Sequence, residues 1–214
     1  MNSAPAPNTF ESFATLWRSF GCESDGSGQY EWLRDVYQEP GRFYHNWQHL
    51  TECLTELAAC RQDFVGYDLS AIEMALWYHD SVYDTKANDN EERSAQVAAE
   101  VLHSAKVNSN VISKVEQLIL ATKRHDAFGD RDAALMLDID LSILCKTSER
   151  FWEYESQIRA EYEWVPLSVF NQKRAEILQQ FLEREYLYQT SRFREVYEVQ
   201  ARSNLKAAIT RLSP

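Results

Sequence analysis

Histidine and aspartate residues recur along the chain in an order typical of divalent-metal sites. His49 comes first, the adjacent pair His79-Asp80 follows, and Asp140 lies further downstream. Imidazole nitrogens and carboxylate oxygens bind divalent ions without a thiolate. One His-Asp pair arises easily by chance, whereas coincidence is a poorer explanation for the ordered set of four. We therefore predict these four residues as metal ligands, and the chemistry expected of them is hydrolysis by metal-activated water.

Further polar side chains flank the predicted ligands. His45 stands four residues before His49 and would act either as another ligand or as a general acid, because an imidazole can donate a proton to a leaving oxygen at neutral pH. Glu91, at the start of a predicted helix, would orient such a histidine or hold a metal-bound water. Thr122 and His125 follow a strongly apolar segment and are additional polar candidates.

Simpler structural roles remain open for each residue taken alone. Histidines on the surface of helices are common, a helix cap would explain Asp80, and an acidic residue such as Glu91 favours a helix N-terminus without catalysing anything. His103 is assigned no functional role. The set His49, His79, Asp80 and Asp140, taken together, favours the metal site.

Two aspartates compete for a role in one apolar segment. Asp138 and Asp140 stand among leucine and isoleucine residues, where a buried carboxylate is costly unless it is paired or metal-bound. At a spacing of two they point to different sides of a helix. Asp140 is the predicted ligand, and one of the two is expected to cap the helix or to brace a histidine.

Composition and periodicity predict an all-α protein. The chain has 214 residues, 44% of them apolar, with only six glycines and five prolines, so long helices are expected and a turn-rich β protein is not. We predict a single compact domain over 1–214, a bundle of eight to ten helices with a flexible tail at 1–9. Helical periodicity predicts segments 10–20, 30–37, 47–63, 71–79 with Ser70 as N-cap, 90–102, 108–123, 133–144, 151–162, 169–186 and 193–212.

The net charge of −11 argues against a nucleic-acid strand as partner, because such sites need clustered lysine and arginine. A small anionic substrate is still compatible, since a bound metal reverses the local field. The sequence predicts neither a signal peptide nor a membrane span. The four cysteines form no CxxC pair, so free thiols and a cytoplasmic location are expected. A homodimer is left open.

The ordered ligand set resembles the HD-domain superfamily of metal-dependent phosphohydrolases, whose H…HD…D pattern is carried here by His49, His79-Asp80 and Asp140. The chain is most similar to the bacterial group of predicted HD phosphohydrolases, and the likeness covers nearly everything after the first dozen residues. Its motifs are Tyr44-His45-Asn46-x-x-His49, Trp77-Tyr78-His79-Asp80-x-Val82-Tyr83-Asp84, Asn90-Glu91-x-x-Ser94-Ala95, Ala121-Thr122-x-x-His125, Asp138-x-Asp140-Leu141, Ile158-Arg159-x-Glu161-Tyr162 and Ala201-Arg202-x-Asn204-Leu205.

A more distant likeness joins the chain to the catalytic domain of cyclic-nucleotide phosphodiesterases. In that family the first histidine of a Tyr-His-Asn run donates a proton and the second binds metal, which implies that His45 is the general acid and His49 a ligand. The present chain differs from that family in length and around the His-Asp pair, so cyclic-nucleotide specificity is not implied.

The resemblance implies an HD fold with one or two divalent ions (Mg, Mn, Zn, Fe, Ni or Co) that hydrolyses a small phosphorylated substrate, a nucleotide among the candidates. Two alternatives stay open. One is a di-iron oxygenase, which would need extra histidines such as His103 or His125. The other is a non-catalytic module that binds metal or nucleotide. The residues expected to contact substrate are Asn46, Asp84, Thr122, His125 and Arg159.

Overall fold

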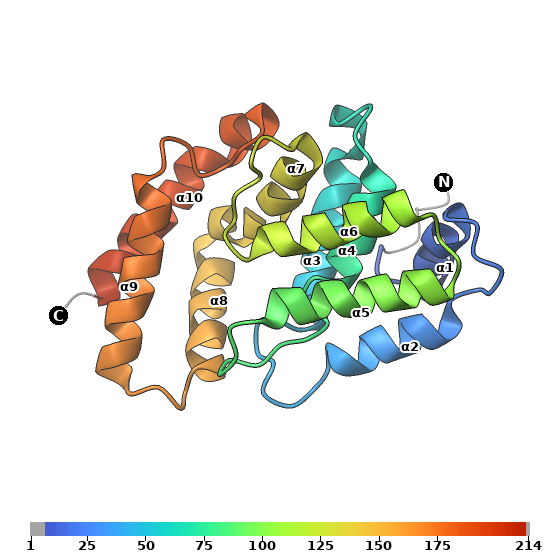
Figure 1. The fold of residues 1–214 in the computed structure, drawn as a ribbon. Helices are drawn as coiled ribbons and strands as arrows, with labels where there is room; N and C mark the ends of the chain where they lie inside the picture. The colour runs from blue at the N-terminus through green and yellow to red at the C-terminus, as the bar shows by residue number, and fades with distance from the viewer. Residues whose placement is uncertain (1–6, 213–214) are drawn as a thin grey trace.

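The computed structural model describes residues 7–212, and within them the chain forms ten α-helices, two short 3₁₀ helices and no strand (Figure 1). The predicted all-α bundle of eight to ten helices is confirmed. The α-helices are α1 (Phe10–Ser19), α2 (Ser27–Val36), α3 (Trp47–Cys60), α4 (Leu69–Tyr78), α5 (Asn90–Ser104), α6 (Ser109–Thr122), α7 (Arg131–Asp140), α8 (Ser148–Glu161), α9 (Leu167–Glu183) and α10 (Ser191–Leu212), and the 3₁₀ helices are η1 (Arg61–Asp63) and η2 (Leu141–Cys145).

Most predicted helix boundaries differ from the observed ones by a few residues, and two of the differences lie next to the predicted ligands. The N-cap of α4 is Asp68 rather than Ser70, because the Asp68 carboxylate accepts a hydrogen bond from the backbone N–H of Ala71 and Ser70 lies inside the first turn. The helix predicted over 133–144 is α-helical only as far as Asp140 and then tightens into η2. Asp140 therefore stands at a helix end rather than inside a helix.

Helix α4 is the buried centre of the bundle. Nearly all of its side chains are buried, from Ala71 to Tyr78, and a helix that is apolar all round must be covered on every side. Helices α1, α3, α5, α6 and α7 pack around it. The His79-Asp80 pair follows directly after α4, so the chain delivers these two polar residues into the interior.

The last two helices form a pair beside this central part. Helices α9 and α10 lie side by side, and α10 also packs against η2 (Figure 1). The Asn204 side chain on α10 donates hydrogen bonds to the backbone carbonyls of Leu144 and Lys146, at 2.8 and 3.0 Å. These bonds fasten α10 to the end of η2, next to the segment that carries Asp140.

Three further predictions concern the chain ends, the thiols and membranes. Of the predicted tail, residues 1–6 lie outside the described residues, whereas the Asn8 amide donates to the Thr51 hydroxyl and Thr9 caps α1. All four cysteines are free thiols. Among residues 7–212, no helix has the length and apolar composition needed to cross a membrane.

Candidate metal centre

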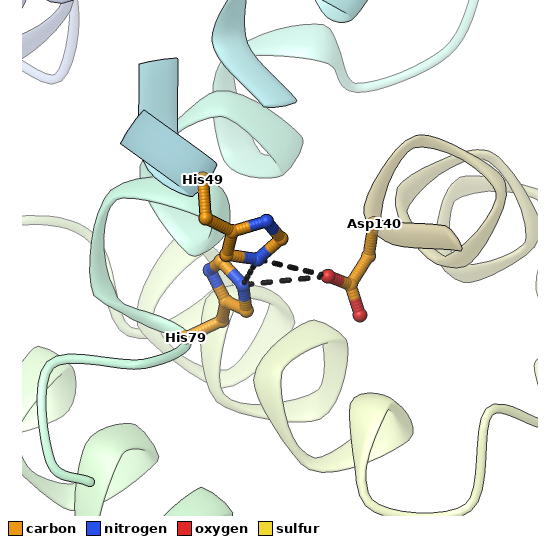
Figure 2. Close-up of side chains that lie close together, drawn as sticks. All are labelled: His49, His79 and Asp140. Atoms are coloured by element: carbon orange, nitrogen blue, oxygen red, sulfur yellow. Dashed lines mark hydrogen bonds and ion pairs between the residues drawn. The ribbon is translucent and has the colours of Figure 1, made fainter. Parts of the chain in front are cut away.

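Three helices bring their ends together at one buried point. His49 lies in the first turn of α3, His79 is the C-cap of α4, and Asp140 is the last residue of α7. Figure 2 shows both imidazoles close to the Asp140 carboxylate. The Nε2 atoms of the two histidines are 3.1 Å apart, and Asp140 Oδ1 lies 3.2 Å from that of His49 and 3.6 Å from that of His79. These ligand atoms form a group suited to one metal ion.

Asp80, in the turn after α4, approaches the same two imidazoles, although it is not one of the three residues of that group. Its Oδ2 lies 3.1 Å from His79 Nε2 and 3.4 Å from His49 Nε2. All five separations that involve an imidazole thus fall between 3.1 and 3.6 Å. Two ligand atoms that each lie about 2.1 Å from an ion are about 3.0 Å apart when the ligand–metal–ligand angle is a right angle. They are about 3.4 Å apart when that angle is tetrahedral. The side chains present therefore fit a divalent ion.

The hydrogen bond of His79 determines which of its nitrogens can bind metal. Its Nδ1 lies 2.8 Å from the carbonyl oxygen of Leu76, which can only accept, so Nδ1 carries the proton. When the ring is neutral, its Nε2 lone pair faces His49 Nε2 across 3.1 Å. Two imidazole nitrogens this close need a proton or a cation between them. A backbone carbonyl behind a ligating imidazole is a common way to orient it toward a metal.

The electrostatics of the group also call for a cation. Burial raises the pKa of Asp140, but hydrogen bonds from His125, His49 and His79 outweigh it and hold that pKa well below its usual range. Burial likewise raises the pKa of Asp80, and the charges of His79 and His45 reverse the effect. Both carboxylates are therefore ionised. Two negative charges in a buried site need a positive partner, which a divalent ion or a protonated imidazole provides.

The cluster forms one wall of a cavity of 350 Å³. A larger cavity of 870 Å³ adjoins it and shares some of its lining. Residues that line both are His45, Glu91, Lys123, His125, Asp140 and Tyr162. His125 reaches the cluster through Asp140, since its Nε2 lies 3.3 Å from Asp140 Oδ2. The His/Asp cluster and these polar side chains therefore face the same space.

His45 is held beside the cluster by a buried carboxylate that the sequence did not single out. Its Nδ1 lies 2.7 Å from Glu161 Oε2, and the other oxygen of Glu161 accepts the backbone N–H groups of residues 43, 44 and 45. The hydroxyl of Tyr83 donates to Glu161 at 2.9 Å, and its ring stacks on His45. Glu91 is the residue that the sequence offers for orienting His45, whereas Glu161 occupies that position. Glu161 appeared in a quoted motif without a role.

The ionisation of Glu161 determines the proton positions on His45. Burial raises the pKa of Glu161, but the hydrogen bonds from His45 and from the backbone of residues 44 and 45 hold it below its usual range. The carboxylate is therefore ionised and can only accept, so His45 Nδ1 carries a proton. When the ring is charged, its second proton is on Nε2.

The remaining predicted contacts fall into two groups. Thr122 lines the smaller cavity, although its hydroxyl donates to the Ile119 carbonyl at 2.7 Å. The second group is Asn46, Asp84 and Arg159, which line neither cavity. Asn46 caps α3 by accepting from the N–H of His49, Asp84 accepts the N–H of Lys86 in a turn, and Arg159 donates to backbone carbonyls of residues 162, 163 and 165 at the end of α8. Each of these three side chains is engaged in local structure, and its contact with substrate stays a prediction.

Arg42 is a second residue that sequence analysis missed. Its guanidinium is buried and donates to the backbone carbonyls of Asp80 at 2.5 Å, Ser81 at 3.1 Å and His45 at 3.3 Å. It thereby ties the His45 segment to the turn that carries Asp80. No sequence signal marked it, because it lies outside every motif and its partners are backbone atoms.

Replacing Arg42 with alanine is expected to lower the free energy of unfolding by about 3 kcal/mol, because buried carbonyls lose a charged donor. Urea denaturation followed by circular dichroism measures the change. Arg34→Ala is the matched control, since that side chain is 48% exposed. Arg42→Lys should recover little stability, because an ammonium group lacks the planar fork. An unchanged midpoint for Arg42→Ala would contradict the proposed tie.

The two competing aspartates have separate roles. Asp140 contacts the two histidines, while Asp138 points the other way. Asp138 accepts the N–H groups of Gln189 and Thr190, both at 2.7 Å, and the Thr190 hydroxyl at 2.6 Å. Asp138 therefore fixes the segment before α10 and contacts neither His49 nor His79. Asp140 is the one that contacts histidines.

The buried Asp138 gives stability a distinct pH dependence. Burial raises its pKa to about 6, although its donors act in the opposite direction. The unfolded chain, with a pKa of about 3.9, loses this proton first. Stability should therefore fall by about 3 kcal/mol as pH rises from 4 to 6 and then level off. Denaturation of the wild type and Asp138→Asn across this range isolates the slope, and Asp35→Asn is the exposed control. Parallel profiles for all three proteins would show that Asp138 does not titrate in this window.

Comparison with known proteins adds no family assignment. No family model, no curated protein and no solved structure matches the chain.

Proposed function

We propose that the protein is a metal-dependent phosphohydrolase of the HD superfamily that acts on a phosphate ester. The observation that supports this most directly is the convergence of His49, His79 and Asp140 at metal-ligand spacing, beside a cavity that His79 and Asp140 line. Asp80 approaches the same imidazoles. The ordered His, His-Asp and Asp residues, which are far apart in the sequence, thus meet at one point.

A metal at this point is the premise of the reaction. His49, His79, Asp80 and Asp140 would hold it through two nitrogens and two carboxylate oxygens. A bound divalent ion supplies positive charge next to the phosphoryl oxygens and activates a water molecule for attack on phosphorus. Such an ion also explains how a chain with a net charge of −11 can admit an anionic substrate.

His45 is the proposed general acid. It lines both cavities, and Glu161 holds its Nδ1, so Nε2 is the atom from which a proton can pass to the departing oxygen. The ionised Glu161 stabilises the charged ring that precedes this transfer. Stacking on Tyr83 fixes the plane of the imidazole. His45 is proposed as the proton donor rather than as a ligand, because its imidazole is not part of the group of ligand atoms formed by His49, His79 and Asp140.

A metal-reconstitution assay tests the proposed function. The protein is stripped with a chelator and reloaded separately with Mg, Mn, Zn, Fe, Ni or Co, and bound metal is measured. Release of inorganic phosphate or p-nitrophenol is then followed with p-nitrophenyl phosphate and bis-p-nitrophenyl phosphate. We expect turnover that requires the ion. Stoichiometric binding of each ion without hydrolysis of either ester would refute a phosphohydrolase.

The di-iron alternative depends on additional histidines. His103 is exposed on α5, whereas His125 contacts Asp140 at 3.3 Å and could serve as one extra ligand. A second iron would need further ligands, and these would have to come from side chains that are already bonded to other groups of the protein. Oxygen consumption by protein loaded with two irons would favour this alternative over hydrolysis.

A further inference from the structure

The larger cavity beside the metal cluster has walls of a different character from the smaller one. It lies among η2, α8, the 162–166 segment and α9, and its volume of 870 Å³ falls in the range of pockets that take sizeable organic molecules. Its shared lining with the smaller cavity, including His45 and Asp140, makes it continuous with the metal cluster. A molecule that bound its phosphate at the cluster would extend its organic group into this space.

Apolar side chains line much of the larger cavity, and some are unusually exposed. Trp164 is 51% exposed and Ile177 is 45% exposed. Phe170 and Phe181 on α9 and Ile158 on α8 extend the same surface. Neighbouring apolar side chains left open to solvent in a cavity mark a place where an apolar ligand is bound.

Most of the cationic groups on these walls already have partners within the protein. The Arg174 guanidinium contacts Glu155 and the Tyr154 hydroxyl, and Lys173 pairs with Glu176. Arg184 donates to the backbone carbonyl of His125. A sugar with many hydroxyl groups would lose its bonds to water here and find few replacements, which is costly. An aryl or alkyl group would lose no such bonds and would cover the exposed apolar side chains.

We propose that the substrate is a phosphate ester whose organic group is large and apolar, aryl or long alkyl, and that this group lies against Trp164, Phe170, Ile177 and Phe181. The proposal rests on the proposed function for the position of the phosphate at the metal cluster. The lining of the two cavities supports the same orientation, because His79 and Asp80 line only the smaller cavity and these four apolar side chains line only the larger one.

Binding measurements test the proposal independently of turnover. Metal-loaded protein is titrated in a calorimeter with methyl phosphate, 2-naphthyl phosphate and glucose 6-phosphate. We expect 2-naphthyl phosphate to bind about tenfold tighter or more than methyl phosphate, from the apolar area that it covers, and glucose 6-phosphate to gain no such advantage. Equal affinity for all three esters, or no binding of 2-naphthyl phosphate, would overturn the proposal.

Variants locate the apolar group. Trp164→Ala and Ile177→Ala should each remove several-fold of the advantage of 2-naphthyl phosphate and leave methyl phosphate unchanged. Trp32→Ala and Val199→Ala are matched controls, because these exposed residues line neither cavity. If both cavity variants still bind 2-naphthyl phosphate with the full affinity advantage over methyl phosphate, the proposed position of the organic group is wrong.

The two proposals fail in different ways. If 2-naphthyl phosphate binds with the expected advantage and no ester is hydrolysed, the phosphohydrolase assignment fails and the apolar pocket stands. If all three esters are hydrolysed with the same kcat/KM and bind equally, the phosphohydrolase stands and the apolar pocket is wrong.

Discussion

Replacing His79 with alanine is expected to weaken binding of the divalent ion by at least about a hundredfold and to abolish metal-dependent turnover. His79 Nε2 lies 3.1 Å from both His49 Nε2 and Asp80 Oδ2, so it is central to the group. Its loss removes a ligand and also leaves the two carboxylates with less compensating charge. Metal content after dialysis and release of phosphate measure the two effects.

His103→Ala is the matched control, since it removes an exposed imidazole from α5. The added ion should raise the melting temperature of the wild type and of this control but not that of His79→Ala, because only a folded protein that binds the ion is stabilised by it. Asp140→Asn keeps the shape of its side chain and provides a second ligand variant. Normal metal content and full turnover in His79→Ala would show that the cluster is not the metal site.

Replacing Glu161 with glutamine is expected to lower kcat by about a hundredfold for an ester with a poor leaving group. The glutamine oxygen can still accept the backbone N–H groups of residues 43–45, but its amide cannot accept the Nδ1–H of His45 as the carboxylate does. His45 therefore loses the partner that stabilises its charged form. Metal content should be unchanged, because Glu161 contacts none of the proposed ligands directly.

The dependence on leaving group separates proton donation from a purely structural role. The p-nitrophenolate ion leaves without a proton, so Glu161→Gln should affect p-nitrophenyl phosphate much less than an alkyl phosphate. Glu163→Gln, an exposed neighbour, is the matched control. If Glu161→Gln slows both esters to the same extent, Glu161 acts on the structure of the site rather than on His45 as a general acid.

Periodicity determined the helices because its cause is local. Side chains three and four positions apart share a helix face, so apolar spacing indicates a helix whatever it later packs against. This is why α3, α5 and α6 begin at or next to their predicted residues. Periodicity did not predict the N-cap of α4, because the cap depends on a hydrogen bond of the Asp68 side chain. It also did not predict the change to 3₁₀ geometry after Asp140, because the spacing of apolar residues does not distinguish the two kinds of helix there.

The order of histidine and aspartate residues along the chain indicated a candidate metal site. The packing of the helices decided which side chains contact one another there. The sequence alone singled out His49, His79, Asp80 and Asp140, because their residue types suit a metal. It did not assign Glu161 to His45, 116 positions away, and it left open whether Asp138 or Asp140 meets the histidines. Such pairings depend on which helix ends converge around α4. That convergence follows from burial of the whole apolar surface at once, and no local pattern encodes it.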